Sequence, residues 1–328
     1  MRRFGDLLLA AVATAVAALL AGVVSAAVPR ETPVRAVEVA AGVYMVQGAP
    51  GEPDADNLGR IGNAGFIVGE TGVMAIDTGT SYRHGMALLA AIRRVTDKPV
   101  RLALVTHTRQ EFLFGAAAFR EQAIPVHMHH LAAGLMRSRC ERCLATLRKL
   151  LGDEAMQGTA MFKPDREFEQ SHTIDTIGRP VQVLYFGHSS GPGDVAVFDV
   201  RSGVLFAGGL LDAQRIPDVQ DGDIEGWNQA LQRLRALPVT AIVPGHGPVA
   251  PAGLIDEVES YLAQLQTRVL ALLHAGAALS EVPDAAALPA FAGWDQYDTV
   301  HRRNASILFV HHEREQMVRQ AGAEAPKP

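Results

Sequence analysis

The sequence has little cysteine, few aromatic residues and no excess of positive charge. Two cysteines occur among 328 residues, aromatic side chains make up 6%, and the formal net charge is -5 at pH 7. Without a broad basic surface, nucleic-acid binding lacks its main electrostatic contribution, so we exclude that class of partner. Hydrophobic side chains make up 48% of the chain, which is enough for one large globular domain or two modest ones.

The N-terminus has the pattern of a secretory signal peptide. The sequence MRR precedes an apolar run over residues 7–24, and small residues follow at 25–27. A basic start, an apolar run and a small-residue cleavage site together predict a signal peptide over 1–27 that is cleaved on export. The mature protein is then periplasmic or secreted. The alternative is an uncleaved N-terminal membrane anchor, because a run of this length could just span a bilayer.

The two cysteines, Cys140 and Cys143, form a C-x-x-C pattern inside a stretch predicted to be helical. They can close a local disulfide, remain structural thiols or act as a thiol-disulfide module. The first two fit better, because no βαβ redox pattern precedes the pair. Two thiolates are too few for a closed zinc site of four cysteines.

Strand and helix patterns alternate between residues 37 and 276. Apolar or β-branched runs predict strands, among them 64–68, 73–76, 102–105, 181–185, 195–199, 204–207 and 241–243. Helical patterns at 84–95 and 227–236 separate some of them, which predicts an α/β fold containing parallel strand pairs. We expect a helical insert at 131–161, a C-terminal helical extension at 277–320 and a polar tail at 321–328. His301, His311 and His312 are expected on a solvated helix face.

Four of the predicted strands end in polar or glycine-rich segments. These are residues 105–112, 186–191, 206–210 and 243–247. Ligand sites collect at strand ends in sheets that helices cover, so the four segments are expected to converge. Their side chains include His107, Arg109, Glu111, His188 and His246.

These segments, in this order, resemble the metallo-β-lactamase superfamily. The D-T-G sequence at 77–79 and the G-H-G sequence at 245–247 are the most specific matches. The resemblance implies a four-layer αββα sandwich of two mixed sheets flanked by helices, over residues 37–276. It also implies that Asp77 supports the site loops by hydrogen bonds rather than binding metal.

A narrower resemblance covers part of the chain. Residues 212–234, with 143–144 and 303–304, are similar to the quinoprotein relay system zinc metallohydrolases. Those are exported proteins associated with quinone-dependent dehydrogenases. The resemblance therefore implies association with a quinoprotein dehydrogenase system.

The metal motif departs from the family pattern at four of its seven positions. The family sequence H-x-H-x-D-H has Arg109, Glu111 and Phe112 at its second, third and fourth ligand positions here, and Gly209 falls on the bridging aspartate. A guanidinium stays protonated and cannot bind zinc, and phenylalanine and glycine offer no donor. The usual two-metal centre should not form, so at most one zinc ion is expected.

Three interpretations of the site remain open. His107, His188 and His246, with Glu111, could hold one zinc ion in a mono-zinc hydrolase of an ester, lactone or thioester. Alternatively, Arg109 places a fixed positive charge where a metal was, and the cleft binds an anionic small molecule with weak or no hydrolysis. In the third, Arg109 and Glu111 neutralise each other in a vestigial cleft. We favour a silent site, because the number of ligands normally decides zinc affinity; no catalytic residue is assigned.

Overall fold

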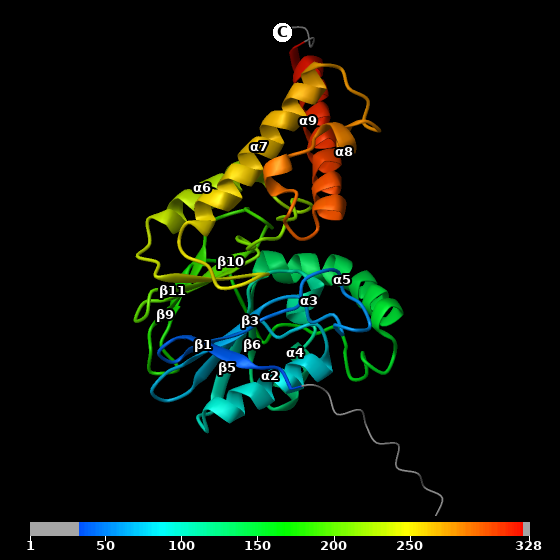
Figure 1. The fold of residues 1–328 in the computed structure, drawn as a ribbon. Coiled ribbons are helices and arrows are strands. Elements are labelled where there is room, and N and C mark those ends of the chain that lie inside the picture. Colours follow the sequence, from blue (N-terminus) through cyan, green and yellow to red (C-terminus); the bar gives the residue numbers. More distant parts are fainter. Residues whose placement is uncertain (1–32, 324–328) are drawn as a thin grey trace, which may run out of the picture. The chain divides into compact units, whose positions relative to one another are not determined.

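The computed structural model describes residues 33–323, and the predicted signal peptide at 1–27 lies outside them (Figure 1). The first sheet has seven strands in the order of the chain. They are β1 (Ala36–Ala40), β2 (Val43–Val46), β3 (Ala64–Val68), β4 (Val73–Ile76), β5 (Val100–Val105), β6 (Val126–His129) and β7 (Arg166–Phe168). Strands β1 to β4 pair antiparallel, and β4 to β7 pair parallel.

The second sheet has five strands in the order β12-β11-β10-β9-β8. Their bounds are β8 (His172–Ile174), β9 (Val181–Tyr185), β10 (Val195–Asp199), β11 (Val204–Gly208) and β12 (Ala241–Pro244). Only the β11–β12 pair is parallel. Both β10 and β11 are buried along their whole length, which agrees with their unbroken apolar sequences.

Helices cover the outer face of each sheet. The first sheet carries α2 (Tyr82–Val95), α3 (Gln110–Leu113), α4 (Ala116–Glu121) and α5 (His130–Leu151), and one apolar cluster joins them to it. The second carries α6 (Ile224–Arg235), α7 (Leu254–His274), α8 (Val282–Ala285) and α9 (Arg302–Ala323). A third apolar cluster joins the two sheets face to face. The four-layer αββα sandwich expected from the sequence is confirmed.

The C-terminal helices lie side by side and differ from the sequence expectation in two respects. Helices α7 and α9 pack along each other, with α8 beside α9 (Figure 1), and α9 continues to Ala323, past the end expected from the sequence. The prediction that His301 lies on a solvated face is wrong, since only 1% of it is exposed. It precedes α9 in a short π-helix and contacts Tyr261 Oη and the carbonyl of Ala286.

No helix within residues 33–323 is both long and apolar enough to cross a bilayer. The predicted signal or anchor falls outside that range.

A buried ion pair ties the two sheets together. Arg179 Nε donates to Asp199 Oδ1 at 2.7 Å, and its Nη1 donates to the carbonyls of Ala41 and Val68. The Arg179 and Asp199 side chains are 3% and 0% exposed. The arginine thus joins the end of β10 to the β1–β2 turn and the end of β3.

Replacing Arg179 with methionine should lower the free energy of unfolding by about 3–5 kcal/mol, because it leaves the buried Asp199 carboxylate without its charged partner, with only the hydrogen bonds from Ser202. Urea unfolding followed by circular dichroism measures the loss. The matched control is Arg201→Met, which breaks an exposed pair with Glu70 and should cost less than about 1 kcal/mol. Equal losses in the two variants would contradict the structural role given to Arg179.

Candidate functional site

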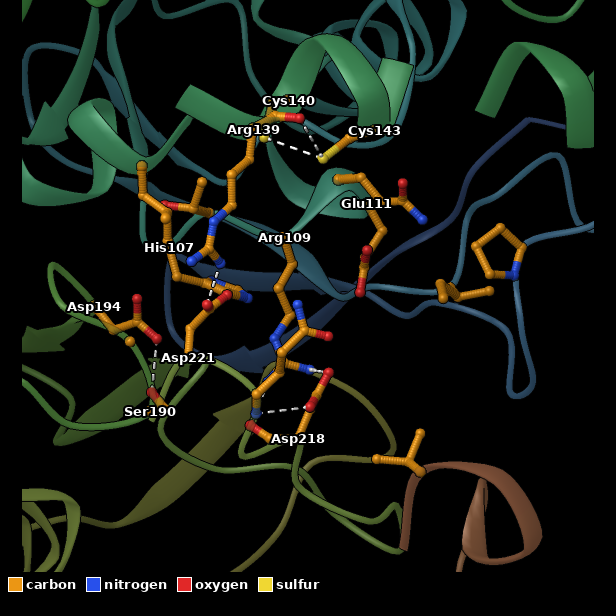
Figure 2. Close-up of a pocket in the computed structure, with 18 of the residues that line it drawn as sticks. His107, Arg109, Glu111, Arg139, Cys140, Cys143, Ser190, Asp194, Asp218 and Asp221 are labelled. Atoms are coloured by element: carbon orange, nitrogen blue, oxygen red, sulfur yellow. Dashed lines mark hydrogen bonds and ion pairs between the residues drawn. The ribbon is translucent and has the colours of Figure 1, made fainter. Parts of the chain in front are cut away.

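One pocket gathers side chains from segments far apart in the chain (Figure 2). It is lined by residues after β5, on α5, after β9, in the loop between β11 and α6, and on α9. The residues used below are His107, Arg109, Glu111, Arg139, Cys140, Cys143, Ser190, Asp194, Asp218, Asp221 and Arg303. Of the four strand-end segments expected to converge, those after β5 and β9 line this pocket. The one after β12 contacts it through His246.

Asp77 orients the first histidine through Thr106. The backbone of Asp77 is left-handed, with φ of 60°, and its carboxylate accepts hydrogen bonds from Thr106 N at 2.8 Å and from Thr106 Oγ1. Thr106 Oγ1 in turn lies 2.7 Å from His107 Nδ1. Asp77 therefore fixes the loop after β5 by hydrogen bonds, the role that the family resemblance implied.

His107 is buried and neutral. Burial, followed by the charge of Arg109, lowers the pKa of His107 to about 3. Its Nε2 is a buried polar atom with no hydrogen-bond partner. One ligand-type nitrogen is therefore available beside the pocket.

His246 lies between two buried carboxylates. Its Nδ1 is 2.7 Å from Asp212 Oδ1, and its Nε2 is 3.1 Å from Glu111 Oε1. Burial alone would lower the pKa of His246, but Asp212 and Glu111 outweigh it and raise that pKa above its ordinary value. Both ring nitrogens thus serve as donors in a carboxylate–imidazolium–carboxylate chain. Asp212 was not identified from the sequence, although a carboxylate three residues after Gly209, the position of the family's bridging aspartate, could have pointed to it.

The ring of Phe112 lies between the two histidines. Its centroid is 4.2 Å from that of His107 and 5.2 Å from that of His246. The Phe112 carbonyl accepts hydrogen bonds from Thr78, and Gly62 packs so closely on the ring that a Cβ there would lie 2.6 Å from Cζ. The apolar Phe112 ring therefore fills the space between His107 and His246 where a metal ion bound to both would have to lie.

A carboxylate from another segment occupies the space beside Gly209. A Cβ placed on Gly209 would lie 2.7 Å from Asp194 Oδ2 and 3.0 Å from the His107 ring. Asp194 is buried, and Ser190 Oγ donates to it at 2.7 Å. Burial raises the pKa of Asp194 to about 6, although Ser190 and Arg109 oppose the shift. Sequence reasoning missed this residue because the family motif does not point to it.

His188 does not join the other two histidines. It is exposed, and its Nε2 lies 2.7 Å from the carbonyl of Asp221. It lines a separate hollow together with His311 and Glu315 of α9. The sequence predicted that His107, His188 and His246 converge, but in the structure His188 does not lie with the other two.

The residues present do not fit a two-zinc centre. Glu111 and His246 bond to each other, Phe112 separates His246 from His107, and His188 faces another hollow. Within the described range, 33–323, no three His, Cys, Asp or Glu side chains are arranged to hold a metal ion.

Arg109 runs through the middle of the pocket toward Asp218 (Figure 2). Its Nη2 donates to the Asp218 carbonyl at 3.1 Å, and its Nη1 lies 3.9 Å from Asp218 Oδ2. One of the three interpretations was that Arg109 and Glu111 neutralise each other. In the structure they do not pair, because Glu111 bonds to His246 and Arg109 bonds to Asp218. Arg303 also pairs with Asp218, at 2.7 Å. Two guanidinium groups thus share one carboxylate.

Cys140 and Cys143 are free thiols in this structure. Their Sγ atoms are 3.3 Å apart, and both residues line the pocket.

Comparisons with known proteins agree with the architecture. A solved metallo-β-lactamase from Pontibacter korlensis is 22% identical, with a TM-score of 0.58 over 70% of this chain and 99% of that one. The DIM-1 metallo-β-lactamase is 15% identical, with a TM-score of 0.56 over 71% and 98%. At these identities the likeness concerns the fold alone.

A linear primary-alkylsulfatase of Pseudomonas sp. is 23% identical over 277 residues, which cover 71% of this chain and 51% of the relative. The chain thus spans about half the length of that curated relative. The model of the metallo-β-lactamase superfamily matches residues 58–246, more than half of the chain. With the sandwich and the conserved order of strand-end motifs, this match shows that the chain belongs to the metallo-β-lactamase superfamily.

Proposed function

We propose that this protein binds a small anionic ligand in the Arg109 pocket and has weak or no metal-dependent hydrolase activity. The observation that carries the proposal is the pair of replacements at the old metal positions. A guanidinium extends into the pocket at residue 109, and the Phe112 ring separates two surviving histidines. Without a metal-bound hydroxide, the usual nucleophile of this fold is missing.

The hydrogen-bonding capacity of Arg109 supports an anion. Arg109 and Arg303 share the single carboxylate of Asp218, and a guanidinium has five N–H donors, more than its contacts with Asp218 occupy. The Arg109 side chain is 23% exposed, so a ligand can reach it while it stays partly shielded from solvent. A guanidinium in such a place binds sulfate, phosphate or carboxylate oxygens with a pair of charge-assisted hydrogen bonds.

An alkyl sulfate is the first ligand to test. The Pseudomonas relative is named for action on linear primary alkyl sulfates, and a sulfate monoester carries the anionic oxygens that Arg109 suits. The proposal for this chain is binding of that class of anion.

Export and association with a quinoprotein dehydrogenase system are also part of the proposal. The signal-peptide pattern over 1–27 supports export, and the similarity of residues 212–234 and 303–304 to the quinoprotein relay system zinc metallohydrolases supports the association. Those two segments meet beside the pocket, where Asn304 Nδ2 donates to the Pro217 carbonyl at 2.6 Å and Arg303 pairs with Asp218. Sequences 212–234 and 303–304 thus act as one structural unit.

The mono-zinc hydrolase is the alternative function. The unpartnered Nε2 of His107 is the observation that favours it. A zinc ion there would need His246 and Glu111 to give up their mutual hydrogen bond.

Replacing Arg109 with glutamine should weaken the binding of a short-chain alkyl sulfate by about tenfold or more, because a charge-assisted pair of hydrogen bonds is lost. Isothermal titration calorimetry measures the dissociation constant, with the corresponding alcohol as the uncharged control ligand. Arg201→Gln, on an exposed surface, is the control variant. Equal affinity for the sulfate and the alcohol would refute the anion site.

Metal analysis of the purified chain should find well under one zinc ion per molecule, even after incubation with zinc and removal of the excess. The reason is that the free Nε2 of His107 is a single donor, because Glu111 and His246 bond to each other and His188 bonds to the Asp221 carbonyl. Inductively coupled plasma mass spectrometry makes the measurement. One zinc per chain that disappears in His107→Ala would establish the mono-zinc alternative instead.

Alkyl sulfate binding should tighten by roughly threefold to tenfold between pH 7 and pH 5. Asp194 has a pKa raised to about 6, chiefly by burial, so it is charged above that pH and repels the ligand, and is neutral below it. Ser190, Arg109, Asp221 and His188 also act on it. Calorimetry across this range should show the change, and Asp194→Asn should remove it. A variant that keeps the full pH dependence would assign it to another group.

A further inference from the structure

The two cysteines of α5 lie where a ligand in the Arg109 pocket can reach them. Cys140 and Cys143 stand one helical turn apart, on the same face of the helix, with Sγ atoms 3.3 Å apart. Both line the pocket that holds Arg109, as does Arg139, the residue before the pair (Figure 2). The dithiol is therefore part of the pocket wall.

The two thiols have unequal environments. Cys140 is 1% exposed and packs in the apolar cluster between α5 and the first sheet, whereas Cys143 is half-buried. The contact between the two Sγ atoms lowers the pKa of Cys143 to about 7 and raises the pKa of Cys140. One accessible thiolate next to one buried thiol is the arrangement of an attacking and a resolving cysteine.

A purely structural role explains the pair less well. Residues three apart in an α-helix have Cα atoms about 5 Å apart, within the range that a disulfide spans. A bridge between them closes a very short loop, which restricts the unfolded chain little and so contributes little stability. The pair can be oxidised and reduced without great consequence for the fold.

We propose that Cys140 and Cys143 are a redox-active dithiol that exchanges with small disulfides bearing carboxylates, which enter through the Arg109 pocket. The choice of anionic disulfides rests on the proposed function, because Arg109 supplies the attraction for carboxylates. The exchange itself depends only on the two thiols.

The exchange balances without a further reactant. The Cys143 thiolate attacks one sulfur of the small disulfide, forming a mixed disulfide and releasing one thiolate. Cys140 then attacks the Cys143 sulfur, forming the intramolecular bridge, and its proton passes to the second departing thiolate. Counted from the Cys143 thiolate, the protein loses two electrons and one proton, and the small disulfide is reduced to one thiolate and one thiol.

The charge of the small disulfide gives the first test. The reduced full-length chain is mixed with oxidised glutathione, which is anionic, or with cystamine, which is cationic, at equal concentration. Loss of free thiols and intact mass are followed over time. We expect one intramolecular disulfide to form, roughly tenfold faster with oxidised glutathione, and Arg109→Gln to abolish that preference. Equal rates for the two compounds in the wild-type chain, or no oxidation by either, would overturn the proposal.

Single cysteine variants test the two roles. Cys140→Ser should accumulate a stable mixed disulfide with glutathione on Cys143, because no resolving thiol remains. Cys143→Ser should stay unmodified, because Cys140 is buried. Modification of Cys140 in that variant, with none of Cys143 in the other, would contradict the assignment.

Failure of this inference can be told apart from failure of the proposed function. The double variant Cys140→Ser, Cys143→Ser has no dithiol, and calorimetry with the short-chain alkyl sulfate should still detect Arg109-dependent binding. If it does while the wild-type thiols are inert, only the dithiol proposal fails. If the thiols exchange without regard to charge and the sulfate does not bind, the anion pocket fails, and with it the preference for anionic disulfides.

Discussion

The pocket depends on His246 being held between Asp212 and Glu111. The His246 ring gives each of the two buried carboxylates a hydrogen-bond partner, although Asp212 Oδ2 has none, and each of the three groups would be costlier to bury alone. These hydrogen-bonded side chains join the loop after β11, the loop after β12 and the start of α3. The same hydrogen bonds also occupy the two side chains, Glu111 and His246, that would otherwise be the best remaining donors for a metal.

Phe112 and Arg109 follow from the same arrangement. Once Glu111 turns toward His246, the Phe112 ring fills the space between the two histidines, where burial of an aromatic ring is favourable and burial of an uncompensated ion is not. Arg109 extends the other way and bonds to Asp218. The result is a pocket with an apolar ring on its inner side and the Arg109 guanidinium, paired with Asp218, on its outer side.

The dithiol adds a second chemistry to that outer wall. Both cysteines line the pocket, but Cys140 is almost fully buried in the apolar cluster whereas Cys143 is half-buried. A helix is a rigid support, so the position of the thiols relative to Arg109 does not depend on a mobile loop. Arg109 and the two thiols therefore lie in the same pocket, so the charge of a small disulfide can affect how fast it reacts with the thiols.

The sequence by itself determined the alternation of strands and helices and the members of the site loops. Unbroken apolar runs such as 204–207 fix buried strands, and the D-T-G and G-H-G sequences fix tight turns whose geometry depends on local residue type. The sandwich, and the expectation that Arg109, Phe112 and Gly209 stand at ligand positions, came from the resemblance to the metallo-β-lactamase superfamily. Only the tertiary structure decided which side chains meet. It paired Glu111 with His246 rather than Arg109, brought Asp194 beside Gly209, turned His188 to another hollow and buried His301. These outcomes depend on hydrogen bonds and packing between segments far apart in the chain, and local patterns carry no information about such contacts.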